Sequence, residues 1–362
     1  MAKVKITGHA SGTGVVTITA PNTSTDRTIT LPDGTGTLLD ENSSLPAANL
    51  TGTVADARIS ALTASKLTGD LPAISGVNVT NVHAVNSGRK NWIINGGFDV
   101  SQRGTYTTAT SAPDGYYLDR WAIDVNAITA NIQQLTTTVD GGTVKTMKII
   151  ATSSATGALQ MYQVVEAFAA LAGRTLTFSA RVKSNQSSTR LQIYDGVSFI
   201  DDAGSRHTGG GDWENLSLTF TPSSSSTTLN PRITGYDGLI ALTTGDYIEA
   251  ANVQLELGSV ATDFEHRSYG EELALCQRYY EAEANQSAWI NIPQLLGGNY
   301  GRTCVYFKVE KRASPSVTYV LSSPSAASNH GTQFVTKNSF NVYLNSMTTY
   351  NIINSWTADA EL

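Results

Sequence analysis

Hydrophobic and polar positions alternate in short runs along most of the chain, and this alternation predicts β-strands. In residues 175–182 one side of the run is apolar throughout, with Leu176, Phe178, Ala180 and Val182. A period of two is the pattern of a half-buried strand. The same period recurs at residues 191–194, 216–220 and 252–257, and Gly, Pro, Ser and Asn separate the runs. With a further strand expected at 91–99, we predict one β-sandwich at residues 91–267.

The pattern changes directly after this segment. Ser268 and Glu271 stand at the spacing of a capping box, which satisfies free N–H groups at a helix start. Apolar residues then repeat at steps of four, three and four, at Tyr269, Leu273, Cys276 and Tyr280, which predicts one apolar stripe on a helix. We therefore expect a connecting helix at residues 268–283, whose stripe packs under the next domain or around a three-fold axis.

The last part of the chain returns to β patterns. Strands are expected at residues 304–309, 315–320, 334–335, 339–344 and 350–358. Together they predict a small C-terminal β domain at residues 284–362. A domain of this size buries a modest fraction of its surface and gains from association with other copies.

The N-terminal quarter lacks aromatic residues, since no Phe, Tyr or Trp precedes Trp92. Aromatic side chains bury the largest area per residue, so this part can hardly build a core alone. Val, Ile and Leu nevertheless recur in it, with strand patterns at 15–19 and 27–31. We predict an N-terminal β segment at residues 1–44 whose core is shared between several chains.

Residues 45–90 carry an imperfect repeat, Asn-Leu-Thr-Gly at 49–52 and Lys-Leu-Thr-Gly at 66–69. Apolar residues occur only once in four or five positions, which is too sparse for a monomeric domain. The spacing favours a slender shaft in which three chains turn these residues toward a common axis. A flexible Ser/Thr/Gly linker is the alternative. The residues expected in trimer packing are Leu50, Leu67, Leu273, Cys276 and Tyr280.

Composition narrows the range of partners. The net charge of −6 and the pI of about 5.4 argue against nucleic-acid binding, which needs a basic surface. No apolar run reaches the length of about 18 residues needed to span a membrane, so no membrane insertion is expected. Cys276 and Cys304 are expected to be reduced and buried, with a disulfide between them as the alternative.

Several patches resemble known families. The runs N-W-I-I-N-G-G-F-D from Asn91, T-L-T-F-S-A-R-V-K from Thr175 and G-D-W-E-N-L-S-L-T-F-T from Gly211 resemble jelly-roll modules related to carbohydrate-binding domains. Residues 254–280, the N-terminal strand patterns and the closing D-A-E-L resemble bacteriophage tail-fibre and receptor-binding proteins. The resemblance implies an all-β homotrimer with a slender N-terminal stalk, a central jelly roll, a short helix and a small C-terminal β domain.

The same resemblance implies a place for the protein. Such fibres attach through the N-terminus to a tail or capsid protein of the virion and present the C-terminal end to the host. We therefore expect a virion fibre protein, made in the host cytoplasm, that attaches the phage to a host cell-surface glycan. A head fibre or decoration protein is the alternative within this class.

Glycan binding needs exposed aromatic faces beside planar polar groups, because sugars present apolar C–H faces ringed by hydroxyls. The candidate residues are Tyr116, Tyr117, Tyr194, Asp195, Trp213 and Tyr236. Burial in the sandwich core is the competing interpretation for each aromatic residue.

Signals for catalysis and metal binding are weak. Asp201 and Asp202 near His207 could form a glycosidase-like group, but the adjacent Ala-Gly-Ser favours a surface turn. Asp114, Asp119 and Asp124 recur at five-residue steps and could bind a structural Ca²⁺; the competing expectation is an Asp119–Arg120 ion pair beside a buried Trp121. We expect no enzyme and no other cofactor, with a tailspike-type glycan depolymerase as the rival from another class.

Overall fold

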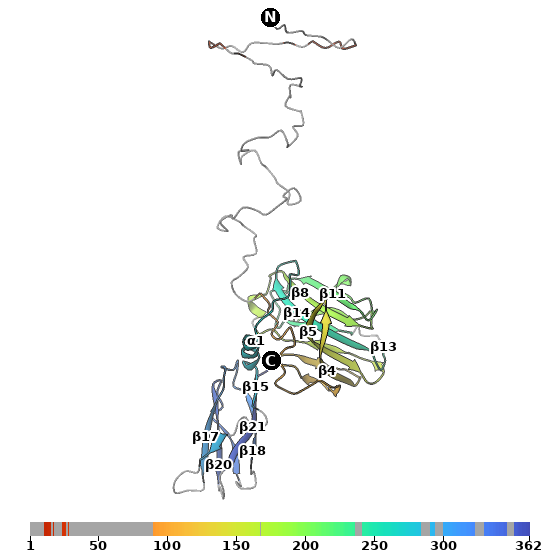
Figure 1. Cartoon of the computed structure of the whole chain (residues 1–362). Coiled ribbons are helices and arrows are strands. Elements are labelled where there is room, and N and C mark those ends of the chain that lie inside the picture. The colour runs from red at the N-terminus through yellow and green to blue at the C-terminus, as the bar shows by residue number, and fades with distance from the viewer. Residues whose placement is uncertain are drawn as a thin grey trace. The chain divides into compact units, whose positions relative to one another are not determined.

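The computed structural model of the chain divides into two compact units, Met1–Val77 and Asn78–Leu362. It describes residues 11–15, 17, 24–26, 28, 90–166, 168–235, 241–283, 290–293, 300–322, 329–345 and 351–362. Nearly all of the predicted N-terminal segment and shaft, with Leu50 and Leu67, lies outside the described residues, as does Tyr236. The second unit contains two β bodies joined by a short helix (Figure 1).

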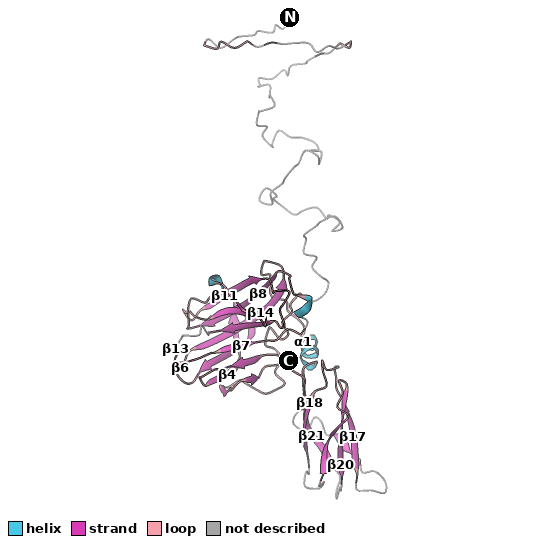
Figure 2. Ribbon diagram, turned by 180° about the vertical axis from the view of Figure 1, so that it is seen from behind, coloured by secondary structure: helices cyan, strands magenta, loops and turns pink. Residues whose placement is uncertain are grey.

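The larger body is a sandwich of two six-stranded antiparallel sheets (Figure 2). The first sheet has the order β1-β4-β5-β14-β8-β11, with β1 Thr110–Ser111, β4 Ala130–Val139, β5 Gly142–Ala151, β14 Tyr247–Leu257, β8 Leu176–Ser184 and β11 Trp213–Phe220. The second has the order β10-β9-β12-β7-β3-β2, with β10 Phe199–Ile200, β9 Arg190–Tyr194, β12 Asn230–Thr234, β7 Gln160–Tyr162, β3 Ala122–Asp124 and β2 Gly115–Tyr116. A separate pair joins β13 Ala241–Leu242 to β6 Ala155–Thr156, and the 3-10 turns are η5 Phe168–Ala170 and η6 Ala203–Ser205.

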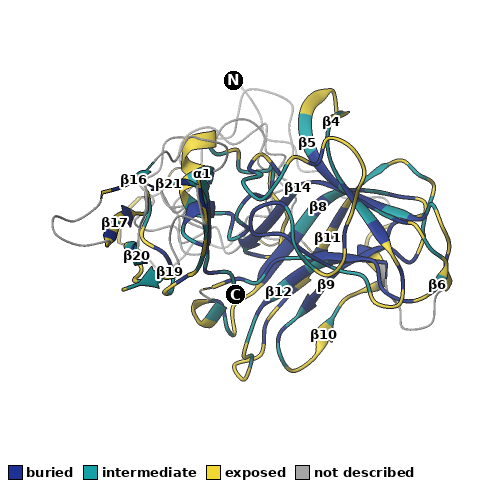
Figure 3. Cartoon of the chain, turned by 90° about the horizontal axis from the view of Figure 1, so that it is seen from below, coloured by how far each residue is buried: buried dark blue, intermediate teal, exposed yellow. Residues whose placement is uncertain are grey.

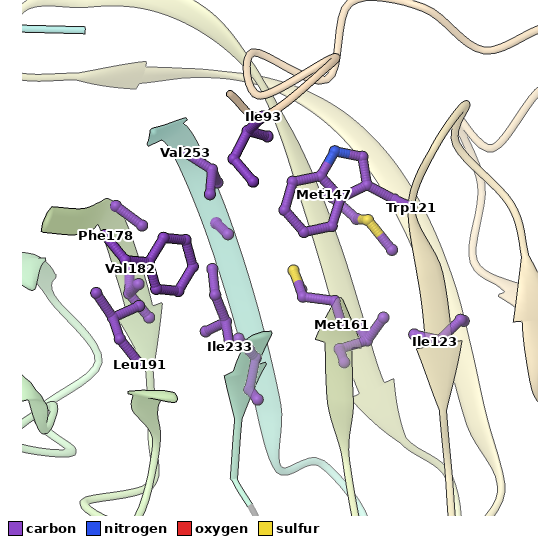
Figure 4. Close-up of a cluster of buried hydrophobic side chains, with 14 of the residues drawn as sticks. Ile93, Trp121, Ile123, Met147, Met161, Phe178, Val182, Leu191, Ile233 and Val253 are labelled. Atoms are coloured by element: carbon purple, nitrogen blue, oxygen red, sulfur yellow. The ribbon is translucent and has the colours of Figure 1, made fainter. Parts of the chain in front are cut away.

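The core lies between these sheets, where the apolar positions of the alternating strands meet. Met147 of the first sheet and Met161 of the second both enter it, beside Phe178 and Ile233 (Figure 4). Every second residue of β8 is inside, as the sequence pattern predicts, because side chains of a strand point alternately to opposite faces. The expected all-β class is confirmed, and so are strands covering residues 176–182, 191–194 and 216–220.

Strand β14 is buried on both faces, whereas its sequence predicts a polar, open side. Gln254 is 1% exposed and Glu256 is 4% exposed. The following loop folds back over them: the N–H of Glu265 donates to Gln254 Oε1, and the N–H of Thr262 donates to Glu256 Oε1. Hydrogen bonds to the loop backbone therefore replace water on this face.

Residues 91–99 form bends and turns in place of the expected strand. The side chain of Asn91 takes the part of a strand partner: its amide nitrogen donates to Val253 O, and its oxygen accepts from Leu255 N. Asn95 has a positive φ of 59°, which no strand contains. A Cβ on Gly96 would lie 2.1 Å from Val253 O, so only glycine fits this close approach.

The helix α1, Tyr269–Gln277, begins with the predicted capping box, in which Ser268 and Glu271 bond reciprocally. The predicted apolar stripe is wrong, because Tyr269 is 59% exposed and Tyr280 lies beyond the helix. The helix ends at Gln277, and Tyr280–Glu283 forms the strand β15. Cys276 and Tyr280 are buried within the single chain, while Leu273 is half-buried.

The smaller body has two sheets. In one, β21 Asn351–Asp359 pairs with β15, with β16 Ile290–Ile292 and with β18 Ser316–Leu321; in the other the order is β17 Gly301–Tyr306, β20 Ser339–Asn345 and β19 Asn329–Gln333. Residues 334–335, expected to be a strand, follow β19 as a bend instead. Phe340, Trp356 and Ile353 lie in the core of this body.

Both cysteines are free thiols, with Cys276 buried as expected and Cys304 exposed on β17 against expectation. Cys304 lies on the outward side of this strand, whereas the next residue, Val305, points into the core. Among the helices of the described segments, none is long and apolar enough to cross a membrane.

Candidate functional site

The outer face of the second sheet carries a group of aromatic and planar polar side chains. Leu191, Ile193, Ile233, Met161 and Ile123 point into the core, so their strand neighbours must point outward. The registers place Arg232 of β12 opposite both Gln192 of β9 and Tyr162 of β7. Strands β12, β9 and β10 lie side by side at this face, with β10 exposed at its edge (Figure 3).

Arg232 stands at the centre of this aromatic–arginine face. Its guanidinium carbon lies 5.2 Å from the ring centroid of Phe199, 5.5 Å from that of Tyr194 and 5.7 Å from that of Tyr162. A guanidinium within about 6 Å of an aromatic ring is attracted by its negative face. Tyr194 and Phe199 also contact each other, with centroids 4.8 Å apart and planes tilted by 33°. The three rings therefore surround one cation.

The rings remain partly open to solvent. Phe199 is 59% exposed, and Tyr162 and Tyr194 are half-buried. Arg232 is also half-buried, and burial lowers its pKa from the usual value. Burial likewise raises the pKa of Tyr162, so its hydroxyl stays protonated at neutral pH. The face thus offers apolar ring surface, a hydroxyl donor and a cation in one place.

Amide and carboxylate groups fix the guanidinium. Arg232 donates from one terminal nitrogen to Gln160 Oε1 at 3.3 Å, and Gln160 Nε2 donates to Asp124 Oδ2. The Nε of Arg232 is buried and has no hydrogen-bond partner within the described residues. Because Nε has no exposed surface, a bound group would have to pair with the terminal nitrogens of the guanidinium.

A second polar set flanks Tyr194. Gln192 Nε2 donates to Asp201 Oδ2 at 3.2 Å, and the same carboxylate oxygen lies 2.6 Å from Arg190 Nε. Arg190 is 5% exposed. The glycosidase-like group considered as an alternative is not assembled, because His207 Nε2 lies 3.0 Å from Asp212 O and its Nδ1 accepts from Gly209 N. The favoured turn is present, since Asp202 O accepts the N–H of Ser205 in a 3-10 turn.

Of the residues predicted to bind a ligand and described by the structure, only Tyr194 belongs to the aromatic–arginine face. The neighbouring Asp195 is 2% exposed and accepts from the N–H groups of Val197 and Ser198 and from the hydroxyl of Ser226. Burial raises the pKa of Asp195, but these hydrogen bonds outweigh it and hold the pKa below its usual range. Asp195 thus shapes the β9–β10 turn that presents Phe199.

The other predicted aromatic residues within the described segments lie elsewhere. The Tyr116 hydroxyl donates to Leu362 O, and the Tyr117 hydroxyl donates to Pro113 O while its ring meets Tyr106 edge-on. Trp213 opens β11 in the first sheet, opposite Lys183. Sequence reasoning missed Tyr162, Phe199 and Arg232. The alternation in Q-M-Y, L-Q-I-Y and N-P-R-I-T could have indicated Tyr162 and Arg232, because it puts them on one face with Tyr194; Phe199 lies outside these runs.

The three aspartates considered for Ca²⁺ serve separate purposes. Asp114 Oδ1 accepts from Val125 N, Asp119 accepts from Gln102, and Asp124 accepts from Gln160. Among the described residues no group of three or more His, Cys, Asp or Glu could hold a metal ion. The expected Asp119–Arg120 pair is also not formed, because Arg120 pairs with Glu361; Trp121 is fully buried as expected.

No model of a known protein family matches the chain, and no curated protein matches it. Solved structures similar to it include a family 61 carbohydrate-binding module in complex with β-1,4-galactotriose (12% identity, TM-score 0.29, covering 47% of this chain and 100% of that one). Others are the family 22 module of Clostridium thermocellum xylanase 10B (14%, 0.29, 44% and 99%) and the enzymatically active domain of tailspike protein 4 of bacteriophage CBA120 (13%, 0.29, 46% and 21%). Likeness at this level does not extend to function.

Proposed function

We propose that the chain binds a cell-surface glycan through the aromatic–arginine face. The observation that carries the proposal is the convergence of Tyr162, Tyr194 and Phe199 on Arg232, with planar amide groups beside them. A sugar ring has an apolar C–H side, which packs on an aromatic ring, and hydroxyls at its rim, which pair with amides and guanidinium groups. Aromatic rings and planar polar groups side by side on one open sheet face are the combination that suits a sugar.

The arrangement favours binding without cleavage. Most glycosidases use two carboxyl groups that are free to act, one as acid and the other as base or nucleophile. Here Asp124 is held by Gln160, and Asp201 is held by Arg190 and Gln192. Release of reducing ends from a bound polysaccharide by the purified protein would contradict a purely binding role.

The proposed setting is a homotrimeric virion fibre. It rests on the sequence: the residues before Trp92 lack aromatic side chains, and the sparse apolar repeat of residues 45–90 suits a core shared by three chains. Three copies on one fibre would turn a weak affinity for a single glycan into strong attachment. The molar mass in solution tests this setting, because a stable monomer at micromolar concentration would contradict it.

The glycan proposal is tested by replacing Arg232 with alanine and measuring retention on a glycan array. A hydrogen bond to a charged group contributes about 1.5–3 kcal/mol, so we expect the affinity of Arg232→Ala to fall about tenfold or more. Arg174→Ala, which removes an exposed arginine in the turn before β8, is the matched control and should bind as the parent does. Equal retention by the two variants would refute the assignment of the site.

A further inference from the structure

A hollow lies on the outer face of the first sheet, away from the aromatic–arginine face. Its volume is about 350 Å³, and its lining includes Asp140, Arg181, Asn215, Ser217, Asn252 and Phe264. Pockets of a few hundred Å³ are of the size that holds small ligands. The two sites lie on opposite sides of one sandwich, because the core separates their sheets.

The floor of the hollow comes from three adjacent strands. In the register of β8 and β11, Arg181 lies opposite Asn215, and Ser179 lies opposite Ser217. Their strand neighbours Ala180 and Leu216 point into the core, so these four side chains face outward. Asp140, in the hairpin between β4 and β5, reaches over to Arg181, and its Oδ1 accepts from Arg181 Nη2 at 2.5 Å.

A bulge in β14 adds Asn252 to this face. The register of β14 against β8 shifts between Ala251 and Gln254, and Asn252 has a φ of 52°. A bulge places two residues opposite one and changes the direction of a side chain. It also lets Val253 bond to the segment before the sandwich, since Val253 N donates to Gly96 O. The same distortion therefore serves packing on one side and the hollow on the other.

The segment 261–264 forms the wall, and it is fixed to the sheet. Gln254 Nε2 lies within 3.4 Å of the carbonyl oxygens of Thr262 and Asp263, and the hydroxyl of Thr262 donates to Glu256 Oε2 at 2.6 Å. This loop places Phe264 at the rim, where its ring meets His266 edge-on. The hollow is thus a preformed feature with one apolar wall.

Several polar groups around the hollow are unused. Within the described residues, the side chains of Ser179, Asn215, Ser217 and Asn252 make no hydrogen bond to another residue. They include donors, acceptors and groups that can be either. The charge of Arg181 is balanced by Asp140, and beside Asp263 the Nζ of Lys90 donates to the Asp263 carbonyl and to Thr262 Oγ1.

We propose that this hollow is a second saccharide site, which takes a neutral sugar unit. Sugar hydroxyls both donate and accept hydrogen bonds, which matches the mixture of donors and acceptors in the amides, hydroxyls and guanidinium around the hollow. The ring of Phe264 offers an apolar surface to the C–H side of a sugar ring. Because the two carboxylates of Asp140 and Asp263 are matched by the two cations of Arg181 and Lys90, the hollow suits an uncharged sugar better than an acidic one. The site is independent of the aromatic–arginine face, because the two share no residue. With both occupied, one sandwich would bridge two glycan segments.

The test uses the full chain carrying Arg232→Ala and Tyr194→Ala, so that the first face is disabled. The neutral probes are galactose, glucose and mannose at millimolar concentration, and the acidic probes are glucuronic acid and N-acetylneuraminic acid. Binding of each sugar is measured by saturation-transfer difference NMR and by calorimetry. We expect at least one neutral sugar to bind. Asn252→Gly, which keeps the positive φ, should weaken it about fivefold, as for one lost hydrogen bond, and Ser217→Trp should abolish it.

The control is Lys183→Ala, two residues along β8 from Arg181 and outside the hollow, which should bind as the background does. Ser217 is exposed, so the tryptophan fills the hollow without entering the core, and circular dichroism verifies the fold of each variant. Absence of binding by all three neutral sugars overturns the proposal. So does binding that survives both variants, or binding of the acidic sugars alone. None of these outcomes bears on the first face.

Discussion

The two β bodies of this chain reach burial by different means. Among the described residues, the core cluster of the sandwich contains 33 buried apolar residues, whereas that of the smaller body contains nine. Hydrophobic burial scales with the apolar area removed from water, so the sandwich has a core of its own to rely on. The smaller body relies in addition on buried, paired charged side chains where it meets α1 and the sandwich.

Two such clusters join the smaller body to its neighbours. In one, Lys311 Nζ donates to Glu281 Oε2 and to the carbonyl of Gln277 at the end of α1, and both charged side chains are 0% exposed. In the other, the Glu361 carboxylate lies between Arg103 and Arg120 of the sandwich. Arg120 also stacks on Tyr279, with its guanidinium carbon 3.7 Å from the ring centroid.

Because one body relies on an apolar core and the other also on buried ion pairs, substitutions should change their stability in different ways. An apolar core loses stability in proportion to the atoms removed, but a buried charge that loses its partner is strongly destabilising. Substitutions at the junction should therefore affect the smaller body more than its modest size suggests. The comparison fails if they behave like substitutions at exposed ion pairs.

The largest effect is expected for Lys311→Met. It leaves Glu281 buried without its cation, and the expected loss in the free energy of unfolding is about 3–5 kcal/mol. The measurement is urea unfolding followed by near-UV circular dichroism at fixed protein concentration, because association would also change the apparent stability.

A double variant sharpens this result. Lys311→Met with Glu281→Leu removes both charges, and replacing a buried pair by apolar residues is often neutral or stabilising. We expect the double variant to recover most of the loss. A double variant as unstable as Lys311→Met would show that shape, and not the orphaned carboxylate, causes the effect.

Much of the sandwich was predictable because its strands alternate. β8, β9 and β11 lie where the period of two predicts them, since one face of each meets the core. The run at 91–99 has the same apolar content but folds as turns, because Asn91 and Gly96 bond to β14 from more than 150 residues away. A contact of that range leaves no local pattern.

The candidate sites were predictable only in part. Tyr194 was found because aromatic residues on strands are obvious candidates, whereas Arg232 was missed because its role arises from the pairing of β12 with β7 and β9. Asn252 likewise lines the hollow on the first sheet only because of the bulge in β14. The apolar stripe predicted on α1 is wrong because the helix buries Glu272 and Gln277 beside Cys276. Glu272 accepts a hydrogen bond from Asn95 N, and Gln277 donates one to Gln102 Oε1.

The next largest effect is the pH dependence of the unfolding free energy that arises from Asp119, which lies beside the junction. Burial raises the pKa of Asp119 to about 6, although hydrogen bonds from Gln102 lower it. The unfolded value is near 3.9, so the folded state binds the proton more tightly. Stability from this group is therefore complete below pH 4 and is lost as the pH rises through 6. The expected decrease is about 3 kcal/mol.

Unfolding at intervals between pH 4 and 7 measures this decrease, with Asp119→Asn as the comparison. The asparagine does not titrate, so its unfolding free energy should vary less over this range than that of the parent. Burial also raises the pKa of Asp99, whereas hydrogen bonds outweigh burial and lower those of Asp195, Glu166 and Glu265 and act in the opposite sense near pH 4, so the difference between parent and variant isolates Asp119. An unchanged slope would show that Asp119 is not the group responsible.

The smallest effect is expected for Glu361→Gln, and it separates a buried junction from an exposed pair. The amide cannot hold Arg103 and Arg120 as the carboxylate does, and loss of hydrogen bonds to a charged group should lower the unfolding free energy by about 2 kcal/mol. The matched control is Glu283→Gln, whose partner Lys308 is 59% exposed; an exposed pair contributes at most about 1 kcal/mol. If the two substitutions lower stability equally, the last residues of the chain do not fasten the smaller body to the sandwich. If Glu361→Gln is the more damaging, burial of the arginines is what makes the C-terminus part of the fold.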